Sequence, residues 1–302
     1  MRNFLTLEDV TREEIFQIFK LAKRLKRKPW GNQLKDKIFA LLFFKPSTRT
    51  RVSFEAGIKQ LGGEAIYLDY ATTQLARGES VEDAARTLER YVNCIIARVY
   101  EHKVLERMAK VANIPIINAL SNLEHPCQIL SDLFTIQEHF GKFDGLKLTY
   151  VGDGGNNIAH SLLLGCSKIG LNLTISCPKQ YAPNPTILQK SLQHSLITGT
   201  KIDVLSDPHK AVKDSDIIYT DVWVSMGMEK EVKKRLETLQ PYQVNESLVK
   251  HANPSFIFMH CLPYEGREVI PDIIYGPHSI VWQQAENRLH VGKALLVFLM
   301  KF

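Results

Sequence analysis

The sequence has few cysteines and no long apolar run, and both shortages narrow the class of protein. Its 302 residues include 5 cysteines, an odd number, and none of them forms a C-x-x-C pair. This pattern disfavours a disulfide framework and a zinc site and favours a reducing compartment. The longest unbroken apolar run, residues 294–300, is far too short to cross a bilayer. A cytoplasmic protein with no membrane anchor and no metal is therefore expected.

The charge of the chain also gives no sign of a nucleic-acid partner. The formal net charge of +6 is spread along the chain, and the basic cluster at 23–28 contains no aromatic side chain on which a base could stack. The cluster is best interpreted as the solvated end of a helix, so no nucleic-acid partner is expected. The length and the 45% hydrophobic content suffice for two domains, each with its own core.

The apolar pattern alternates between strand and helix. Thr11 and Glu14 have the spacing of a capping box and predict a helix over 12–27. Buried strands are expected in two sets, at 37–44, 64–68, 94–99 and 115–119, then at 146–151, 173–177, 201–205, 216–219, 256–260 and 279–283. The fold class is α/β, with two parallel-sheet α/β domains and the active site in the cleft between them. The expected domains are 1–136 and 137–285, with a C-terminal helix of about 286–302 packing back on the first.

Polar clusters follow the carboxyl ends of the expected strands, where open α/β sheets bind ligands. After the first strand, Ser47, Thr48, Arg49, Thr50 and Arg51 immediately precede a helical pattern. Hydroxyls, guanidiniums and a helix N-terminus together favour a doubly charged phosphate. The alternative is that Ser47 only caps the helix and the arginines are solvated.

Three more polar residues lie at the ends of the third and fourth strands. Arg98 interrupts an otherwise apolar strand, where a buried guanidinium needs an anionic partner, so a structural salt bridge is the alternative to a ligand. His125 and Gln128 are three residues apart at the start of a helix and share one face. An imidazole and an amide in this arrangement can both contact a carbonyl oxygen.

The second half contains a glycine-rich turn at 152–157 that resembles a dinucleotide fingerprint. Asn157 stands where the third glycine belongs, and no acidic residue follows the next strand to hold a ribose. Asparagines there suit an amino-acid ligand better. Asp221 ends a strand and could bind an α-ammonium group, whereas Cys261 could be a nucleophile, a polar contact or inert packing. Arg288 could equally be a helix cap or a salt-bridge residue.

Taken together, these motifs resemble the carbamoyltransferase family, and within it the ornithine branch, over nearly the whole chain. The segment 43–51 is similar to the family's carbamoyl-phosphate loop, and His-Pro-Cys-Gln at 125–128 matches the ornithine form of the second motif. Three stretches, at 73–79, 221–227 and 260–263, also look specific to the ornithine branch. The resemblance implies transfer of a carbamoyl group from carbamoyl phosphate to the side-chain amine of ornithine, without a cofactor, in arginine metabolism.

The resemblance also implies a role for individual residues. Carbamoyl phosphate would be held by Ser47, Thr48, Arg49, Thr50, Gln74, Arg98, His125, Gln128, Cys261, Leu262 and Arg288. Ornithine would be held by Leu120, Asn157, Asp221, Ser225 and Met226. The catalytic residues would be Arg49, Arg98, His125 and Cys261. Gln74 would reach the site of a neighbouring subunit in a homotrimer.

Two departures from the family pattern and three rival functions stay open at this point. The stretch 263–269 lacks the usual Ala-His-Arg-Gly-Glu run and is one residue shorter, and Gly154-Gly155 is one glycine longer than common. The rivals are a carbamoyltransferase for aspartate, putrescine or acylated ornithine, an NAD-dependent dehydrogenase, and a non-catalytic homologue. The serine-methionine-glycine stretch at 225–227 argues against the first rival, and the missing acidic residue argues against the second.

Overall fold

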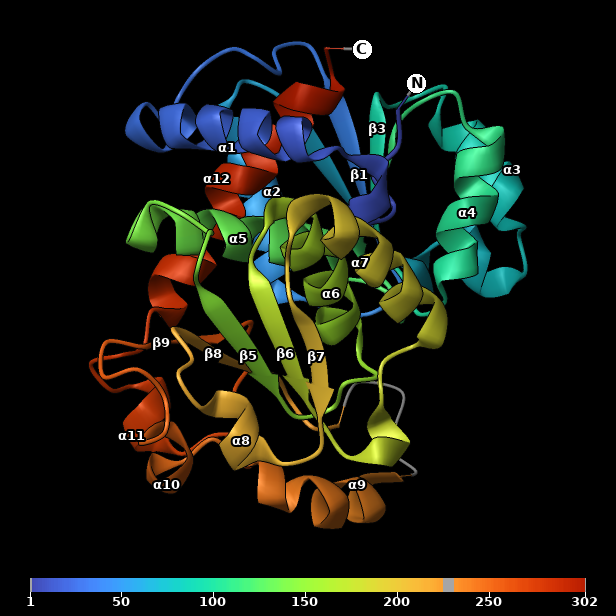
Figure 1. Cartoon of the computed structure of the whole chain (residues 1–302). Coiled ribbons are helices and arrows are strands. Elements are labelled where there is room, and N and C mark those ends of the chain that lie inside the picture. The colour runs from blue at the N-terminus through green and yellow to red at the C-terminus, as the bar shows by residue number, and fades with distance from the viewer. Residues whose placement is uncertain (1, 225–230, 302) are drawn as a thin grey trace. The chain divides into compact units, whose positions relative to one another are not determined.

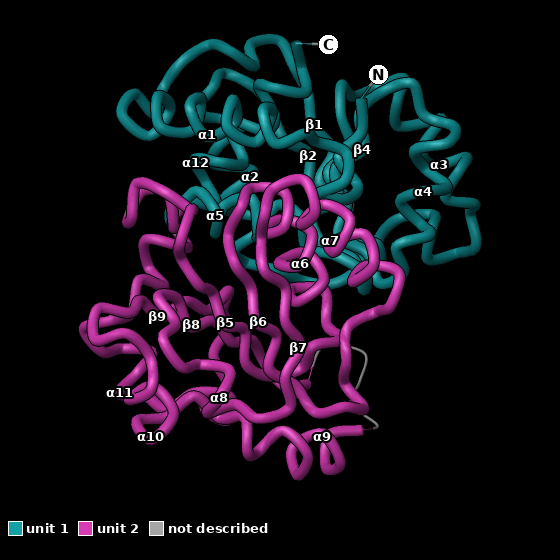
Figure 2. Tube along the Cα trace, viewed as in Figure 1, with its two compact units in different colours: residues 1–134, 286–302 teal, residues 135–285 magenta. Residues whose placement is uncertain are grey.

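The computed structural model describes residues 2–224 and 231–301 of the chain. These divide into two compact units, unit 1 (Met1–Phe134 with Glu286–Phe302) and unit 2 (Thr135–Ala285), which Figure 2 shows in different colours. The prediction of two parallel-sheet α/β domains is confirmed, because every strand pairing in both sheets is parallel. Over the described residues, no helix is both long enough and apolar enough to span a membrane.

Unit 1 is built on a four-stranded sheet with the order β2-β1-β3-β4. Its strands are β1 (Ile38–Phe43), β2 (Glu64–Asp69), β3 (Cys94–Arg98) and β4 (Ile116–Leu120). Its helices are α1 (Arg12–Arg27), α2 (Thr48–Gln60), α3 (Val81–Leu88) and α4 (His102–Val111), with short 3-10 turns at Leu7–Asp9, Tyr70–Thr72 and Gln74–Arg77. Helices α3 and α4 lie side by side (Figure 1). The boundaries between the units fall within two helices, α5 (Pro126–Phe140) and α12 (Val281–Leu299).

Unit 2 is built on a five-stranded sheet with the order β7-β6-β5-β8-β9. Its strands are β5 (Lys147–Val151), β6 (Asn172–Ser176), β7 (Ile202–Leu205), β8 (Ile217–Thr220) and β9 (Ile257–His260). Its helices are α6 (Asn157–Ile169), α7 (Pro185–Thr198), α8 (Pro208–Val212), α9 (Val232–Leu239), α10 (Glu246–Val249) and α11 (Pro271–Ile274), with 3-10 turns at Lys179–Tyr181 and Gln240–Tyr242. Helix α6 is buried along its length and packs against α7.

The sequence predicts some of these boundaries and misses others. Helix α1 begins and ends as predicted, and Thr11 and Glu14 form the expected capping box. The strand predicted at 279–283 is wrong: Ser279 makes only an isolated bridge to Phe258, and α12 begins at Val281. The β-branched residues there are followed by strong helix formers, whose propensity extends the helix back over them. The C-terminal helix therefore begins about five residues before the predicted 286, and Arg288 lies inside it.

Each sheet contains one point where the direction of the connections reverses. From β1 the chain crosses to β2 on one side and then returns to place β3 on the other. From β5 it crosses to β6 and β7 on one side and then returns to place β8 on the other. The loops after the two central strands diverge at such a switch point and leave room for a ligand at the carboxyl ends. Unit 1 therefore offers a site between β1 and β3, and unit 2 a site between β5 and β8.

The glycine-rich turn after β5 is packed too tightly for a side chain at one of its two adjacent glycines. A Cβ atom on Gly154 would lie 2.7 Å from the Cys177 sulfur and 2.9 Å from the Tyr181 carbonyl oxygen. On Gly155 the nearest atom would be 3.4 Å away, and neither glycine has a left-handed backbone conformation. The extra glycine therefore serves close packing against the segment after β6.

We predict that Gly154→Ala lowers the free energy of unfolding by about 1–3 kcal/mol, because the added methyl group must displace backbone. Gly155→Ala is the matched control and should have the smaller effect, since its methyl group meets ordinary contact distances. Urea unfolding of both variants measures the difference. Equal stability of the two variants would contradict the packing argument.

Candidate active site

The switch point of unit 1 begins with the N-terminus of α2. Ser47 caps the helix by accepting a hydrogen bond from the Thr50 amide at 3.3 Å, and the first turn contains no acidic residue. Thr48 and Arg49 are exposed, whereas Thr50 is buried. The free amides and the positive end of the helix dipole therefore lie beside hydroxyl and guanidinium groups, an arrangement that binds anions.

Parallel pairing brings the ends of the neighbouring strands to the same edge. Phe43 at the end of β1 pairs with Arg98 at the end of β3, and Arg98 pairs with Leu120 at the end of β4. Arg98 is 7% exposed and Lys45, in the loop after β1, is 8% exposed. The Lys45 ammonium lies 5.0 Å from the centre of the Tyr100 ring. Two buried cations thus lie at the switch point.

A third cation comes from α12. Arg288 donates one hydrogen bond to Gln128 Oε1 and another to Thr50 Oγ1, the latter at 3.3 Å. Gln128 in turn donates from Nε2 to the buried Asp132 at 2.8 Å. The two hydrogen bonds hold the planar guanidinium between α2 and α5, so Arg288 is a fixed member of the site and not a helix cap.

These cations act on His125, which precedes α5 and is 5% exposed. Burial and the positive charges of Arg288, Arg98 and Lys45 lower the pKa of His125 well below its usual range. Burial and the charge of Arg98 lower the pKa of Lys45 to about 8. The imidazole is therefore neutral at physiological pH and has one N–H to donate, and the three cations beside it favour an anionic ligand. We call Lys45, Thr50, Arg98, His125, Gln128 and Arg288 the cationic cluster.

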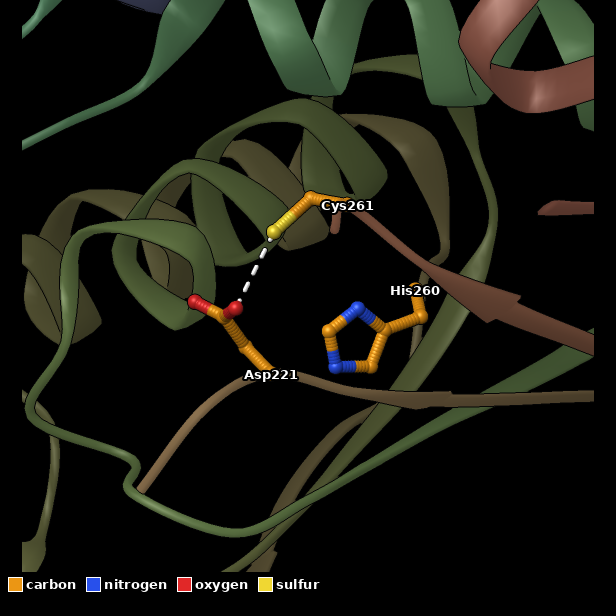
Figure 3. A group of neighbouring side chains, drawn as sticks. All are labelled: Asp221, His260 and Cys261. Carbon is orange, nitrogen blue, oxygen red and sulfur yellow. Dashed lines mark hydrogen bonds between the residues drawn. The ribbon is translucent and has the colours of Figure 1, made fainter. Parts of the chain in front are cut away.

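The switch point of unit 2 centres on a carboxylate. Asp221 directly follows β8 and accepts a hydrogen bond from the Cys261 thiol, which directly follows β9, with 3.0 Å between sulfur and Oδ1 (Figure 3). The Asp221 Oδ2 atom accepts from Asn156 at 3.4 Å, and Oδ1 also accepts from the Val222 amide at 2.8 Å. Burial raises the pKa of Asp221, although the hydrogen bonds from the Cys261 thiol and the Val222 amide oppose that rise. The thiol therefore acts as a donor to a carboxylate and is oriented by it.

The segment at 263–269 that departs from the family pattern supplies a second buried carboxylate. Glu268 is fully buried, lies 3.1 Å from His260 Nε2, and accepts from the backbone amides of Glu265 and Arg267. The Leu262 amide donates to His260 Nδ1 at 2.8 Å, so the other ring nitrogen carries the proton and donates to Glu268. Burial opposes ionisation of Glu268, but these hydrogen bonds outweigh it and lower the pKa. Although the segment 263–269 is one residue shorter than the family pattern, these hydrogen bonds fix its position.

One group of side chains in the described ranges has the donor types of a metal site. The donor atoms of Asp221, His260 and Cys261 all lie within 4.8 Å of one another (Figure 3). Both ring nitrogens of His260 already have hydrogen-bond partners, the Leu262 amide and Glu268. A metal ion would have to displace one of these partners, so the geometry fits the hydrogen-bonded role better than a ligand set.

Arg235 of α9 joins two of the loops at this edge. Its guanidinium pairs with Asp153 in the turn after β5, and its Nε donates to the Trp223 carbonyl oxygen at 2.8 Å. The side chains of Arg235 and Asp153 are each 4% exposed. Asp153 also accepts from the Gly155 amide at 2.9 Å, which shapes the turn that leads to Asn156. Asp153 is therefore a structural residue of the glycine-rich turn.

The structure places the predicted site residues in three groups. Ser47, Thr48, Arg49, Thr50, Arg98, His125, Gln128, Arg288 and Leu120 lie in unit 1, and Asn157, Asp221, Cys261 and Leu262 lie in unit 2. Ser225 and Met226 lie outside the described residues. Gln74 is exposed after the edge strand β2, and within the described part of unit 1 its side chain makes no hydrogen bond to the cationic cluster.

Two residues of these two edges, Lys45 and Glu268, were missed by the sequence argument. Lys45 lies between Phe44 and Pro46, and a lysine just after a buried strand is a signal that could have been followed. Asn156 was among the asparagines that the sequence analysis assigned to an amino-acid ligand, but its bond to Asp221 depends on sheet order and could not be predicted. The pairing of Glu268 with His260 has no local signal, because nothing in the sequence requires that carboxylate to fold back.

Family models match both units. The carbamoyl-P binding domain of aspartate/ornithine carbamoyltransferase matches residues 2–138, and its Asp/Orn binding domain matches residues 144–299. A curated relative from Thermococcus kodakarensis, named ornithine carbamoyltransferase, is 50% identical over 99% of this chain and 96% of its own length. A relative of the same name from Bacillus cereus is 49% identical over 99% of this chain and 95% of its own length.

Solved structures agree over both units. The ornithine carbamoyltransferase of Pyrococcus furiosus has a TM-score of 0.95 at 49% identity, covering 99% of this chain and 97% of that one. The anabolic ornithine carbamoyltransferase of Campylobacter jejuni has a TM-score of 0.95 at 40% identity, covering 100% of this chain and 99% of that one. An N-acetyl-L-ornithine transcarbamylase is also similar, at 30% identity, a TM-score of 0.90, and coverage of 99% of this chain and 100% of that one. The chain belongs to the aspartate/ornithine carbamoyltransferase family.

Proposed function

We propose that the chain is an ornithine carbamoyltransferase, which forms citrulline and phosphate from carbamoyl phosphate and ornithine. The strongest support is the pair of switch-point sites of opposite charge: a cationic cluster in unit 1 and a buried carboxylate, Asp221, in unit 2. The first suits the dianionic phosphate group of an acyl phosphate and the second an ammonium group. Relatives that share about half of the sequence carry this name, and one of them, from Pyrococcus furiosus, is named anabolic. We therefore favour arginine synthesis over arginine breakdown.

Carbamoyl phosphate would bind to the cationic cluster together with the first turn of α2. Ser47, Thr48, Arg49 and Arg98 would hold the phosphate, while Thr50, Arg288, Gln128 and His125 would contact the carbamoyl group. The neutral imidazole of His125 suits a carbonyl oxygen, because its single N–H can donate as negative charge develops there. Hydrogen bonds already hold Arg288 and Gln128 in place, and such pre-organised donors are the condition for electrostatic stabilisation of a transition state.

Transfer requires no covalent enzyme intermediate. The side-chain nitrogen of ornithine forms a bond to the carbamoyl carbon, the bond from that carbon to the phosphate oxygen breaks, and the departing phosphate accepts the amine proton. The amine has a solution pKa of roughly 10.4, so it must be desolvated and held in its neutral form. Asp221 and Cys261 would orient it, and Asn157 with Leu120, Ser225 and Met226 would bind the rest of the amino acid. Leu262 would contact the carbamoyl group.

We predict that ornithine is the preferred acceptor over putrescine, with a difference in kcat/KM that can reach about 10⁴-fold. The reason is that a site built for an α-carboxylate and an α-ammonium group leaves polar groups unpaired when putrescine binds. A citrulline-forming assay with a panel of amines measures the ratio. N-acetylornithine belongs in the panel, since a similar structure is an N-acetyl-L-ornithine transcarbamylase. Comparable values for putrescine or N-acetylornithine would refute the ornithine assignment.

We predict that Cys261→Ser keeps the activity within roughly tenfold, because a hydroxyl can replace the thiol as the donor to Asp221. Cys261→Ala is the matched comparison and should lose roughly 10- to 100-fold in kcat/KM, since the carboxylate then lacks that donor. Steady-state kinetics of both variants test the order. Mass spectrometry that detects a carbamoylated Cys261 during turnover would overturn the orienting role in favour of a nucleophile.

We also propose a homotrimer in which Gln74 completes the site of the next subunit. The support is that β2 is an edge strand whose residues are only partly covered, with Ile66 46% exposed, and Val52 on α2 54% exposed. An exposed apolar edge strand in a folded protein needs a cover, and a second copy is the simplest one. Gln74 follows this edge and is exposed, so its amide is available to a neighbour.

We predict that Gln74→Ala and Arg49→Ala homotrimers are both poorly active, but that unfolding and refolding them together restores activity. With equal, random mixing, about one quarter of the sites receive an intact Gln74 from one chain and an intact Arg49 from the next. Separately refolded samples mixed without unfolding are the control and should stay inactive. If verified mixed trimers recover nothing, Gln74 does not act across an interface.

A further inference from the structure

The last turn of α1 leaves one backbone carbonyl without its usual partner. Leu25 lies in that turn, and in a continuing helix its carbonyl oxygen would accept from the amide four residues later. That residue is Pro29, which has no N–H to donate. Because Leu25 is 2% exposed, its carbonyl group needs a donor from another part of the fold.

The donor is Lys293 of α12. Its ammonium group donates to the Leu25 carbonyl oxygen at 3.3 Å and to the Pro29 carbonyl oxygen at 3.2 Å. The third bond, at 2.8 Å, goes to Oε1 of Gln60, the last residue of α2. These bonds use all three N–H groups of the ammonium. Lys293 is 0% exposed and no carboxylate in the described part of the chain pairs with it, so these three acceptors stabilise a fully buried cation.

Helices α2 and α12 approach each other closely where the lysine stem passes. A Cβ atom on Gly57 of α2 would lie 2.9 Å from Lys293 Cγ and 3.4 Å from Leu289 Cδ1. A glycine at this position therefore gives the stem room to reach its acceptors on α1 and α2, the two helices beside α12 in Figure 1. Lys293 thus fixes α12 against both helices at one point.

Arg288 lies on the same helix, five residues before Lys293. This separation is about 7.5 Å along the axis of an α-helix, and α12 is continuous over both positions. A second link to α1 lies next to the arginine, because Lys26 donates to Asn287 Oδ1 at 2.8 Å. The Arg288 guanidinium therefore reaches the cationic cluster from a helix whose position is set by α1 and α2.

We propose that Lys293 is a positioning residue for the transfer reaction: it fixes α12 and thereby holds the Arg288 guanidinium at the carbamoyl group of the substrate. This inference rests on the proposed function, which assigns that contact to Arg288. The three acceptors of Lys293 lie outside the cationic cluster, so its effect on turnover must pass through α12. A displacement of about 1 Å at a group that binds substrate can cost up to about 100-fold in rate.

Steady-state kinetics of the full chain, with citrulline as the measured product, test the proposal. Lys293→Met keeps the stem but removes the three donors, so we expect kcat/KM for carbamoyl phosphate to fall by roughly tenfold. The loss should come more from KM than from kcat, because Arg288 contacts the bound substrate as well as the transition state. The KM for ornithine should stay within about twofold, because Asp221 and its partners belong to unit 2. Lys59→Met, which removes an exposed lysine beside Gln60, is the control and should match the unmodified chain.

A double-mutant cycle with Arg288→Met separates positioning from a general loss of stability. Arg288→Met should itself be poorly active, so the cycle is measured at high enzyme concentration, and circular dichroism gives the folded fraction that corrects each rate. If Lys293 acts through the guanidinium, adding Lys293→Met to Arg288→Met should lower kcat/KM by less than about twofold further. A loss of roughly tenfold in both backgrounds would overturn the proposal, because Lys293 would then act independently of Arg288.

A third variant keeps the test decisive if Lys293→Met does not fold. Gly57→Ala then takes its place in the cycle, with the same non-additive result expected, because the added methyl group displaces the lysine stem and keeps its charge. If Lys293→Met folds and kcat/KM per folded chain is unchanged, Lys293 only stabilises unit 1 and the proposal is overturned. If the unmodified chain forms no citrulline, the proposed function itself is refuted, together with the role of Lys293 in it.

Discussion

The reversal of connection direction in each parallel sheet is the constraint on which both candidate sites depend. Parallel strands require long crossovers, and the loops after two adjacent strands diverge only where the crossovers turn back. In unit 1 this point lies between β1 and β3, and in unit 2 between β5 and β8. Most polar side chains of the two sites follow these strands or the strands beside them, and Arg288 is added from α12. The chemistry of each unit is therefore decided by a handful of positions at a single edge.

The two edges resolve the problem of buried charge in different ways. In unit 2 each buried carboxylate receives donors from the protein: Asp221 from Cys261 and Asn156, and Glu268 from His260 and backbone amides. In unit 1 several cations are gathered, and His125 and Lys45 are shifted toward their neutral forms. A site completed by its own hydrogen bonds is pre-organised for a neutral or cationic group, whereas a site with several cations favours an anion.

Particular residues show how much of the structure could be predicted from the sequence. Helix α1 has a capping box and a regular apolar period, so its ends are predictable from local signals alone. The start of α2 at Thr48 cannot be predicted from periodicity, because its first turn is polar, and Ser47 as a cap is the signal that indicates it. Near residue 281 the β-branched residues predict a strand, but the helix formers that follow extend α12 over this position. The contacts of Lys45, Asn156 and Glu268 depend on which strands are neighbours, and no local sequence pattern indicates the strand order.

The chain order of the cationic cluster has a consequence for synthesis. Arg288 belongs to α12, which follows every strand of unit 2, but its hydrogen bonds are made to Thr50 and Gln128, which precede all of them. A ribosome therefore releases most of unit 1, and then the whole of unit 2, before the last cation of the cluster exists. Domains of a growing chain generally fold in the order in which they emerge. The nascent polypeptide thus passes through a long stage in which the first unit has its sheet but not its complete cationic cluster, which forms only after α12 has emerged.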